Sequence, residues 1–242
     1  MKPLIIATDI DGTLTRKNRT LDPRVLEQLA RLTSMGAHVI LVSSHAFPAV
    51  STLAEYMGVR YLVAETGSCG GRPWEPLYIE PLPNRDEILD ILMRHGFKPT
   101  SSNRFRLADI SIDHGDQDPV KRIKVISRIL RRFRVNIVYS GYAIHISRSG
   151  IDKGYGLRKL LDIIGINATI VAMGDGLNDI PLFHVADLSI APSNAPLEVK
   201  KEATIVLPFE YSDAAYHALA NIENFFKLRK MDLKKLSRAL MK

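Results

Sequence analysis

Two aspartates separated by a single residue, Asp9 and Asp11, directly follow the short apolar run at residues 4–8. Side chains two residues apart leave an extended chain on the same side, so both carboxylates can face one ligand. Gly12 comes next and allows the backbone to turn sharply. A turn with solvated aspartates is the alternative interpretation, because short motifs recur by accident. The pair alone leaves both interpretations open.

A second acidic pair, Asp175 and Asp179, follows the apolar run at residues 169–173. Carboxylate oxygens at the end of a strand are suitable ligands for a hard cation. The alternative is an ordinary N-cap for a helix that begins near Asn178 or Asp179. The spacing therefore indicates either a cation site or a helix start.

Ser43, Ser44 and Lys153 are weaker signals when each is taken alone. The serines follow the apolar run at residues 38–42, where helix capping would also explain them, and a lysine at the start of a helix is usually a surface residue. In open α/β sheets, ligands bind outside the carboxyl ends of the strands. We therefore expect these polar residues to gather at one edge of a sheet.

The hydrophobic pattern contains the strands and helices that would position these residues. Runs that are apolar throughout and separated by amphipathic helices are typical of a parallel sheet covered on both faces. The expected strands lie at 4–8, 38–42, 61–64, 169–173, 188–191 and 204–207, and the expected helices at 23–35, 46–57, 153–164 and 213–226. The pattern predicts a doubly wound, Rossmann-like α/β core.

The segment at residues 81–150 has a different pattern. It predicts helices at 84–95 and 119–133, a strand at 105–113, and a hairpin around Ser140 and Gly141. Such a segment forms a small α+β module inserted between two halves of the core. We expect a core at 1–80 and 151–228, a cap domain at 81–150, and a basic C-terminal tail at 229–242.

Composition excludes several classes of protein. The 242 residues are 46% hydrophobic and 24% charged, which is ordinary for a soluble globular protein. The single cysteine, Cys69, excludes an intramolecular disulfide and a cysteine-built metal site. No apolar stretch approaches the roughly 20 residues that a membrane span needs, and the N-terminal run is too short for a signal peptide. We expect a cytoplasmic protein without a membrane partner.

Taken together, the acidic pair, the serine, the lysine and the second acidic pair resemble the haloacid dehalogenase-like phosphatase superfamily. The elements DxDGT and GDxxND are among its more specific motifs, and the resemblance extends to about Phe226. The inserted segment lies between the serine and lysine motifs, as the type-2 caps of that superfamily do. SNRFR at 102–106 and YSGY at 139–142, together with His145, resemble the archaeal phosphoglycolate phosphatases. The tripeptide at 65–67 departs from the usual Glu-Asn-Gly because Thr66 replaces the asparagine.

The resemblance implies a role for each residue of the site. Asp9 would be the nucleophile that forms an aspartyl-phosphate, and Asp11 would act as general acid and then general base. The implied ligands of Mg²⁺ are Asp9, Asp11 through its backbone carbonyl, Asp175 and Asp179. Ser43, Ser44 and Lys153 would hold the phosphoryl group. Electrostatics leads to the same cofactor, because four carboxylates and a dianionic substrate need a divalent cation and a lysine as counter-charge.

The resemblance also implies that the cap selects the substrate. Phosphoglycolate carries a carboxylate besides its phosphate, and Asn103 and Arg104 would bind it, with His145 as a third candidate. A surface arginine of the cap is the alternative interpretation of Arg104. A sugar-phosphate or mannosyl-3-phosphoglycerate phosphatase remains an alternative within the same class.

The net charge of +7 raises an alternative from another class, a nucleic-acid-binding protein. Much of the excess lies in the basic runs at 128–134 and 227–242. Such runs are usually a solvated helix face, and no aromatic residues accompany them in a binding strand. We therefore expect a small anionic phosphate ester, and no nucleic acid, as the partner. The sequence does not indicate an oligomeric state.

Overall fold

The computed structural model describes residues 2–228, and the predicted basic tail at 229–242 lies outside the described residues. A mixed sheet of eight strands forms the centre of the larger part, in the order β11-β10-β9-β1-β2-β3-β4-β5. Its strands are β1 (Leu4–Thr8), β2 (His38–Val42), β3 (Tyr61–Ala64), β4 (Cys69–Arg72), β5 (Glu75–Ile79), β9 (Thr169–Met173), β10 (Leu188–Ala191) and β11 (Ile205–Val206). The six strands from β11 to β3 run parallel, and β4 and β5 are antiparallel additions at the edge.

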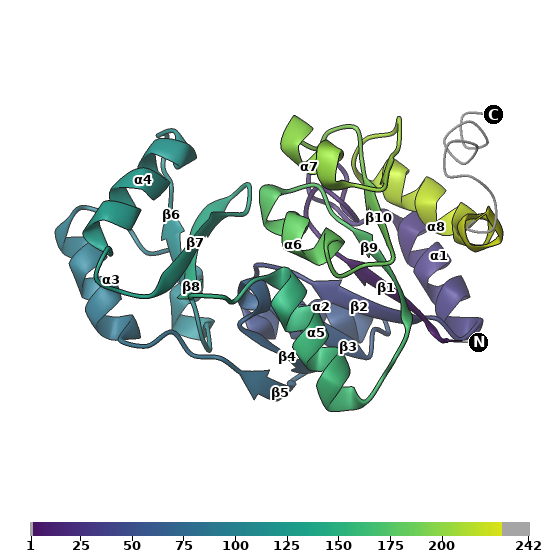
Figure 1. Cartoon of the computed structure of the whole chain (residues 1–242), viewed down its shortest axis with the longest axis horizontal. Helices are drawn as coiled ribbons and strands as arrows, with labels where there is room; N and C mark the ends of the chain where they lie inside the picture. The colour runs from purple at the N-terminus through teal and green to yellow at the C-terminus, as the bar shows by residue number, and fades with distance from the viewer. Residues whose placement is uncertain (1, 229–242) are drawn as a thin grey trace.

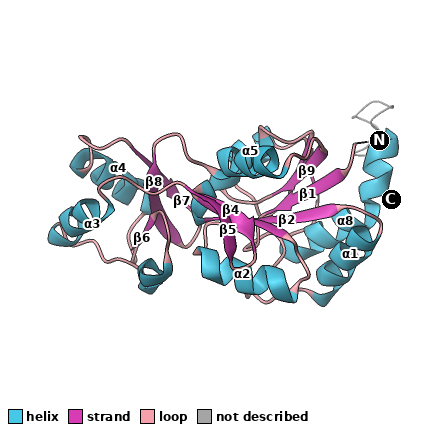
Figure 2. Cartoon of the chain, turned by 90° about the horizontal axis from the view of Figure 1, so that it is seen from below, coloured by secondary structure: helices cyan, strands magenta, loops and turns pink. Residues whose placement is uncertain are grey.

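Helices cover both faces of this sheet (Figure 2). They are α1 (Pro23–Ser34), α2 (Phe47–Tyr56), α5 (Lys153–Ile164), α6 (Ile180–Phe183), α7 (Leu197–Glu202) and α8 (Tyr211–Leu228). Successive side chains of β1 point to opposite faces of the sheet. Ile6 packs in a core with α1, α2 and α8 on one face, and Ile5 and Ala7 pack in a core with α5, α6 and α7 on the other. The doubly wound α/β fold predicted from the sequence is confirmed.

The middle of the chain forms a second sheet at one side of the first (Figure 1). It consists of β6 (Ile110–Asp113), β7 (Val135–Tyr139) and β8 (Ala143–Arg148), paired antiparallel in the order β6-β8-β7. Helices α3 (Arg85–Arg94) and α4 (Pro119–Ile129) pack on it around their own core, which includes Ile88, Ile110 and Ile146. This is the inserted α+β module that the sequence predicted, and we call it the cap.

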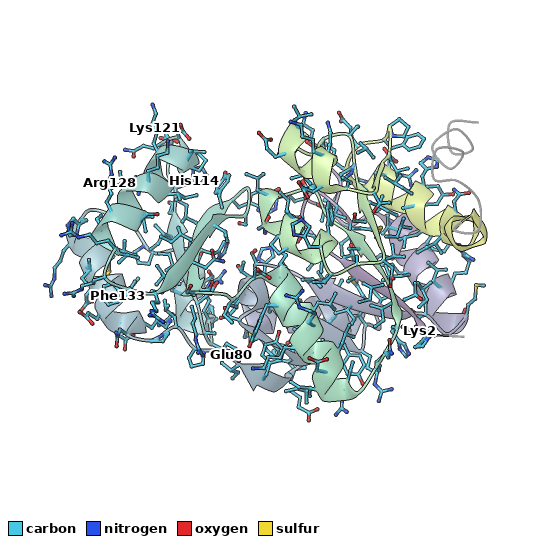
Figure 3. The ribbon with its side chains drawn as sticks, in the orientation of Figure 1. Lys2, Glu80, His114, Lys121, Arg128 and Phe133 are labelled. Carbon is cyan, nitrogen blue, oxygen red and sulfur yellow. The ribbon has the colours of Figure 1, made fainter. Side chains whose placement is uncertain are left out.

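Glu80 lies where the chain passes from the larger part to the cap (Figure 3). Its carboxylate accepts hydrogen bonds from Tyr155 at 2.9 Å and from Arg148 at 3.1 Å, and it pairs with Lys159. Tyr155 and Lys159 belong to α5, whereas Arg148 ends β8 on the chain's way back from the cap. One carboxylate therefore holds both crossings against α5.

The boundaries of two cap elements differ from the prediction. The strand expected from residue 105 begins at Ile110, and residues Ser101–Phe105 form a 3-10 helix instead. The backbone N–H groups of Leu107, Ala108 and Asp109 donate to the buried carboxylate of Glu65, so they are not free to join a ladder. The helix expected to reach residue 133 ends at Ile129.

The hairpin of β4 and β5 was not expected from the sequence. Its first strand contains Gly70 and Gly71, which lack the β-branched and aromatic side chains that indicate a strand. A Cβ on Gly70 would lie 2.7 Å from the ring of Tyr78, so the glycine is needed for close packing. In the described part of the chain, no helix is long and apolar enough to span a membrane.

Candidate active site

The polar residues of the two main motifs lie at the carboxyl ends of adjacent strands. Asp9 follows β1 and Asp175 follows β9, and these strands are neighbours in the sheet. Ser43 follows β2 on the other side of β1. Lys153 is the first residue of α5, which begins there because the Asp152 side chain accepts a hydrogen bond from the N–H of Tyr155.

Three carboxylates and one lysine form the buried centre of this site. Asp9, Asp175 and Asp179 each offer an oxygen, and these oxygens lie within 4.8 Å of one another. The Nζ of Lys153 donates to Oδ1 of Asp9 and to Oδ1 of Asp179, both at 2.6 Å. Only 1% of the Lys153 side chain is exposed. The lysine is therefore fully committed to neutralising carboxylates.

The pKa values show that one ammonium does not balance this set of acids. Burial and the neighbouring Asp179 raise the pKa of Asp9 to about 7, although Lys153 opposes the shift. Burial and the charges of Asp9 and Asp179 raise the pKa of Asp175 to about 8. Burial disfavours the ammonium of Lys153, but the two carboxylates outweigh it and raise the pKa of this lysine. A divalent cation among all-oxygen donors would supply the missing positive charge.

Two glycines allow the loops of the site to approach one another. A Cβ on Gly12 would lie 2.2 Å from Oδ2 of Asp175, and Gly12 has a φ of +79°. A Cβ on Gly174 would lie 2.5 Å from atoms of Asp179. Any side chain at these positions would displace a carboxylate of the centre.

Asp11 lies beside this centre but has its own partners. Its carboxylate accepts hydrogen bonds from Arg19 at 3.1 and 3.3 Å, and Nε2 of His45 lies 2.6 Å from Oδ2. Burial acts to raise the pKa of Asp11, but His45 and Arg19 outweigh burial and hold it below its ordinary value. Sequence reasoning did not single out Arg19 or His45. The position of His45, directly after the two serines, is the only signal that could have indicated it.

The loops after β2 and β9 are joined by side-chain hydrogen bonds. Asn178 donates to Oγ of Ser44 at 3.0 Å, and Thr66 donates to the same oxygen at 3.2 Å. Oδ2 of Asp179 accepts from the backbone N–H groups of Asp175 and Gly176. These bonds fix the loop containing the second acidic pair relative to the serines.

A cavity of about 370 Å³ lies between this centre and the cap. The larger part of the chain contributes Asp9, Asp11, Arg19, Ser43, Ser44, His45 and Asn178. The cap contributes Thr100, Ser101, Ser102, Arg106, Ser111, Ser140, Tyr142, Ala143 and His145. Nearly every lining side chain is polar or charged, which suits a small hydrophilic ligand.

Of the three cap residues predicted to bind the substrate, one lines the cavity and two do not. His145 lines the cavity, whereas Asn103 and Arg104 are not among the described residues that line it. Arg104 is exposed and its guanidinium lies 5.0 Å from the ring centre of Phe105. The side-chain amide of Asn103 bonds instead to backbone atoms of Thr100 and Ser111. The arginine that the cap contributes to the cavity is Arg106, which the sequence analysis did not assign to the site.

The fold and the site define a class of protein: a capped, doubly wound α/β enzyme whose carboxylate and lysine centre can hold a divalent cation. A family model described as haloacid dehalogenase-like hydrolase matches residues 6–98 and 106–219. The chain therefore belongs to this family, as its motifs indicated, and is an enzyme of the phosphatase kind.

Proteins with similar sequences support this assignment, and solved structures share the fold. A phosphoglycolate phosphatase of Halorubrum lacusprofundi is 30% identical over 90% of this chain and 96% of its own length. One of Methanothrix thermoacetophila is 33% identical over 83% of this chain and 88% of its own. The crystal structure of Thermoplasma acidophilum 0175 matches with a TM-score of 0.81 at 22% identity, covering 92% of this chain and 99% of that one. The sucrose-phosphatase of Synechocystis, solved with sucrose and phosphate, matches with a TM-score of 0.72 at 18% identity over 92% of this chain and 99% of that one.

Proposed function

We propose that this enzyme is a Mg²⁺-dependent phosphatase that hydrolyses 2-phosphoglycolate to glycolate and phosphate through an aspartyl-phosphate on Asp9. The observation that supports the chemistry best is the buried contact of Lys153 with Asp9 and Asp179, next to Asp175. The names of the similar archaeal phosphatases support the choice of substrate.

The donor set of the site fits Mg²⁺. Asp9, Asp175 and Asp179 offer oxygens that lie close enough together to share one ion. In the proposed site, Asp9, Asp175 and the backbone carbonyl of Asp11 would bind the ion, and Asp179 would bind it directly or through water. The ion would supply positive charge for the phosphoryl oxygens.

In the proposed first step, a carboxylate oxygen of Asp9 attacks the phosphorus atom and the bond to the leaving oxygen breaks. Asp11 gives its proton to that oxygen, so glycolate leaves as the alcohol. In the second step, Asp11 takes a proton from a water molecule that attacks the phosphorus of the aspartyl-phosphate. Phosphate leaves and the carboxylate of Asp9 is restored. Arg19 and His45 favour the deprotonated form of Asp11 that the second step uses. In the proposed first step, Nε2 of His45, which lies 2.6 Å from Oδ2 of Asp11, would share with it the proton that passes to the leaving oxygen.

Ser43, Ser44 and Lys153 would hold the phosphoryl group in this scheme. Ser43 lies in the cavity wall at the end of β2, and Lys153 already contacts the proposed nucleophile. In this scheme the ammonium, which contacts Asp9 and Asp179, would also neutralise the phosphoryl oxygens. Such preorganised charge is the main contribution that a protein makes to phosphoryl transfer.

Hydrolysis of a sugar phosphate is a second candidate, supported by the size of the cavity. A volume of about 370 Å³ exceeds the needs of so small a molecule as phosphoglycolate. Exposed residues of the basic run such as Arg128 lie on α4, on the outer side of the cap (Figure 3), and no residue of the run lines the described cavity, so the site gives no support to binding of nucleic acid.

Phosphate release from a panel of monoesters, measured with and without Mg²⁺, tests the proposal. We expect the highest kcat/KM for 2-phosphoglycolate, loss of activity after treatment with EDTA, and recovery with Mg²⁺. Ca²⁺ should restore little activity, because it is larger and tolerates looser coordination. Full activity in metal-stripped buffer would contradict the role of the ion, and a higher kcat/KM for a sugar phosphate would favour the second candidate.

A further inference from the structure

Arg106 and His145 form part of the cavity wall on the cap side, and burial lowers the pKa of His145, which favours its neutral form. Their side chains are only 3% and 4% exposed. Both residues are therefore almost desolvated while they border a space that a ligand can enter. A charged contact in such a place is stronger than the same contact at the surface.

The hydrogen bonds of Arg106 leave part of its guanidinium available. Nη1 donates to Oδ1 of Asp109 at 2.5 Å, Nη2 donates to the carbonyl of Ser44 at 2.9 Å, and Nε donates to Oγ of Ser102 at 3.1 Å. A guanidinium has five N–H groups, so these three bonds leave two without an acceptor among the described residues.

Two neighbouring buried atoms face each other at slightly more than hydrogen-bond length. Nδ1 of His145 and Oδ2 of Asp109 lie 3.6 Å apart, and neither forms a shorter hydrogen bond among the described residues. Buried polar atoms are nearly always satisfied in native proteins, because leaving them unpaired costs free energy. Asp109 can therefore hold His145 as well as Arg106, and the donors that remain for a ligand at this wall are the spare N–H groups of Arg106.

The position of Arg106 indicates which part of a ligand it would meet. Its bond to the carbonyl of Ser44 places the guanidinium one residue away from Ser43, a proposed phosphate-binding residue. A ligand whose phosphate lies at Ser43 needs only a short chain to bring a second anionic group to Arg106.

Other basic residues near the cavity fit this role less well. The side chain of Arg19 is 47% exposed and binds the carboxylate of Asp11 on the larger part of the chain, so a contact with it would be weaker than one with the buried Arg106. His45 contacts the same carboxylate. Arg104 is exposed and lies outside the described lining.

From these contacts we propose that Arg106 and His145 bind the carboxylate of the substrate and so determine specificity, with Asp109 as the positioning residue that holds Arg106. This inference rests on the proposed function, because it assigns the recognition of the second anionic group at the same site. The substrate class is a phosphate monoester whose alcohol carries a carboxylate one carbon away.

The test compares 2-phosphoglycolate with ethyl phosphate, which has the same phosphate and carbon chain but no carboxylate. In Arg106→Lys, kcat/KM should fall about ten- to a hundredfold more for 2-phosphoglycolate, because an ammonium cannot reproduce the planar contacts. The comparison within one variant cancels general damage to cap closure. Arg94→Lys, at an exposed position of the cap, is the matched control and should change both substrates equally.

His145→Gln leaves the pair of Arg106 and Asp109 in place and provides the test if Arg106→Lys is too unstable to assay. It should reduce kcat/KM about two- to tenfold more for 2-phosphoglycolate. Binding of 3-phosphonopropionate and of propylphosphonate, measured by calorimetry, gives a readout without turnover. Only the carboxylated phosphonate should bind more weakly to the variants.

The outcomes separate this inference from the proposed function. Failure of the wild-type enzyme to hydrolyse 2-phosphoglycolate would overturn the proposed function. Normal wild-type hydrolysis, combined with equal losses on both esters in Arg106→Lys and His145→Gln, would overturn this inference alone. A selective loss in Arg104→Lys instead of Arg106→Lys would also overturn it and assign the carboxylate to the exposed arginine.

Discussion

Lys153 shows how a single residue sets the electrostatics of the site. A buried ammonium is costly unless it is paired, and here each of its two short contacts goes to a different carboxylate. Removing Lys153 would leave Asp9 and Asp179 uncompensated, whereas removing either acid would leave the other contact intact. The lysine is thus the residue on which the anionic form of the proposed nucleophile depends.

Gly12 allows a test of how closely the two acidic loops must approach. In Gly12→Ala, the new Cβ would displace the Asp175 carboxylate, so we expect phosphatase activity to fall at least about a hundredfold. Gly150→Ala is the matched control, since Gly150 has a φ of +84° with no atom within 4 Å of its Cβ position. Both variants should lose about 1 kcal/mol of stability from the left-handed backbone, as measured by urea denaturation. Equal activity in the two would show that the approach of the loops is unimportant.

At this scale, residue types at strand ends predicted much of what the structure brings together. Asp9, Asp175 and Asp179 could be placed because parallel strands deliver their carboxyl ends to one edge. The positions of Arg19 and Arg106 could not be predicted in this way. The position of Arg19 depends on how the loop after β1 folds back, and that of Arg106 depends on how the cap docks. Arg104 and Arg106 differ by two residues in sequence, and only the 3-10 turn that ends at Phe105 decides which one reaches the cavity.

Among the elements, α1 illustrates how a helix start contributes to stability. Its N-cap is Asp22, a buried carboxylate that accepts hydrogen bonds from the backbone and side chain of Arg24 and from Ser212. Bonding to the Arg24 side chain outweighs burial and lowers the pKa of Asp22 well below its ordinary value. The carboxylate therefore favours the folded state only while it is ionised.

We expect Asp22→Ala to lower the free energy of unfolding by about 1–2 kcal/mol near neutral pH. Because the folded pKa is depressed, this contribution is present above the unfolded pKa of about 4 and decreases as pH falls below it. Urea denaturation of both proteins at about pH 7 and about pH 3 measures the difference. A difference that stays constant or grows at low pH would contradict the assignment of the shift.

The elements themselves were largely predictable from hydrophobic period, with informative exceptions. Strands β1, β2, β3, β9 and β10 lie where apolar runs indicated them, because a strand covered on both faces must be apolar throughout. The hairpin of β4 and β5 was not predicted because close packing requires its glycines, Gly70 against the ring of Tyr78 and Gly71 against the backbone of β5. In the first part of the expected strand at 105–113, backbone N–H groups donate hydrogen bonds to Glu65 instead of to a neighbouring strand. This contact joins segments distant in sequence, so the local pattern does not indicate it.

On the scale of the whole molecule, Glu65 joins the cap to the larger part. Its fully buried carboxylate accepts from the N–H of Phe47, at the start of α2, and from those of Leu107, Ala108 and Asp109 in the cap. The last of these residues holds Arg106. The anchor of the cap and the proposed carboxylate site are therefore part of one hydrogen-bonded network.

Replacement of Glu65 by Gln should weaken this connection, because the amide NH₂ would face N–H donors. We expect a loss of about 1–3 kcal/mol in the free energy of unfolding and faster hydrogen exchange of the amides at residues 107–109. Exchange in β1 should change far less. Glu27→Gln makes the same chemical change at an exposed position of α1 and serves as the control. Unchanged exchange at 107–109 in Glu65→Gln would show that other contacts hold the cap.

Rapid acid quenching during turnover of ³²P-labelled 2-phosphoglycolate with Mg²⁺ tests directly whether Asp9 accepts the phosphoryl group. The wild-type protein should retain label that hydroxylamine releases, as an acyl phosphate does. In Asp9→Asn, the label should be absent and turnover reduced by at least about a thousandfold, because an amide is a poor nucleophile. Labelled Asp9→Asn protein, or retention of more than about a tenth of wild-type turnover in that variant, would contradict the account.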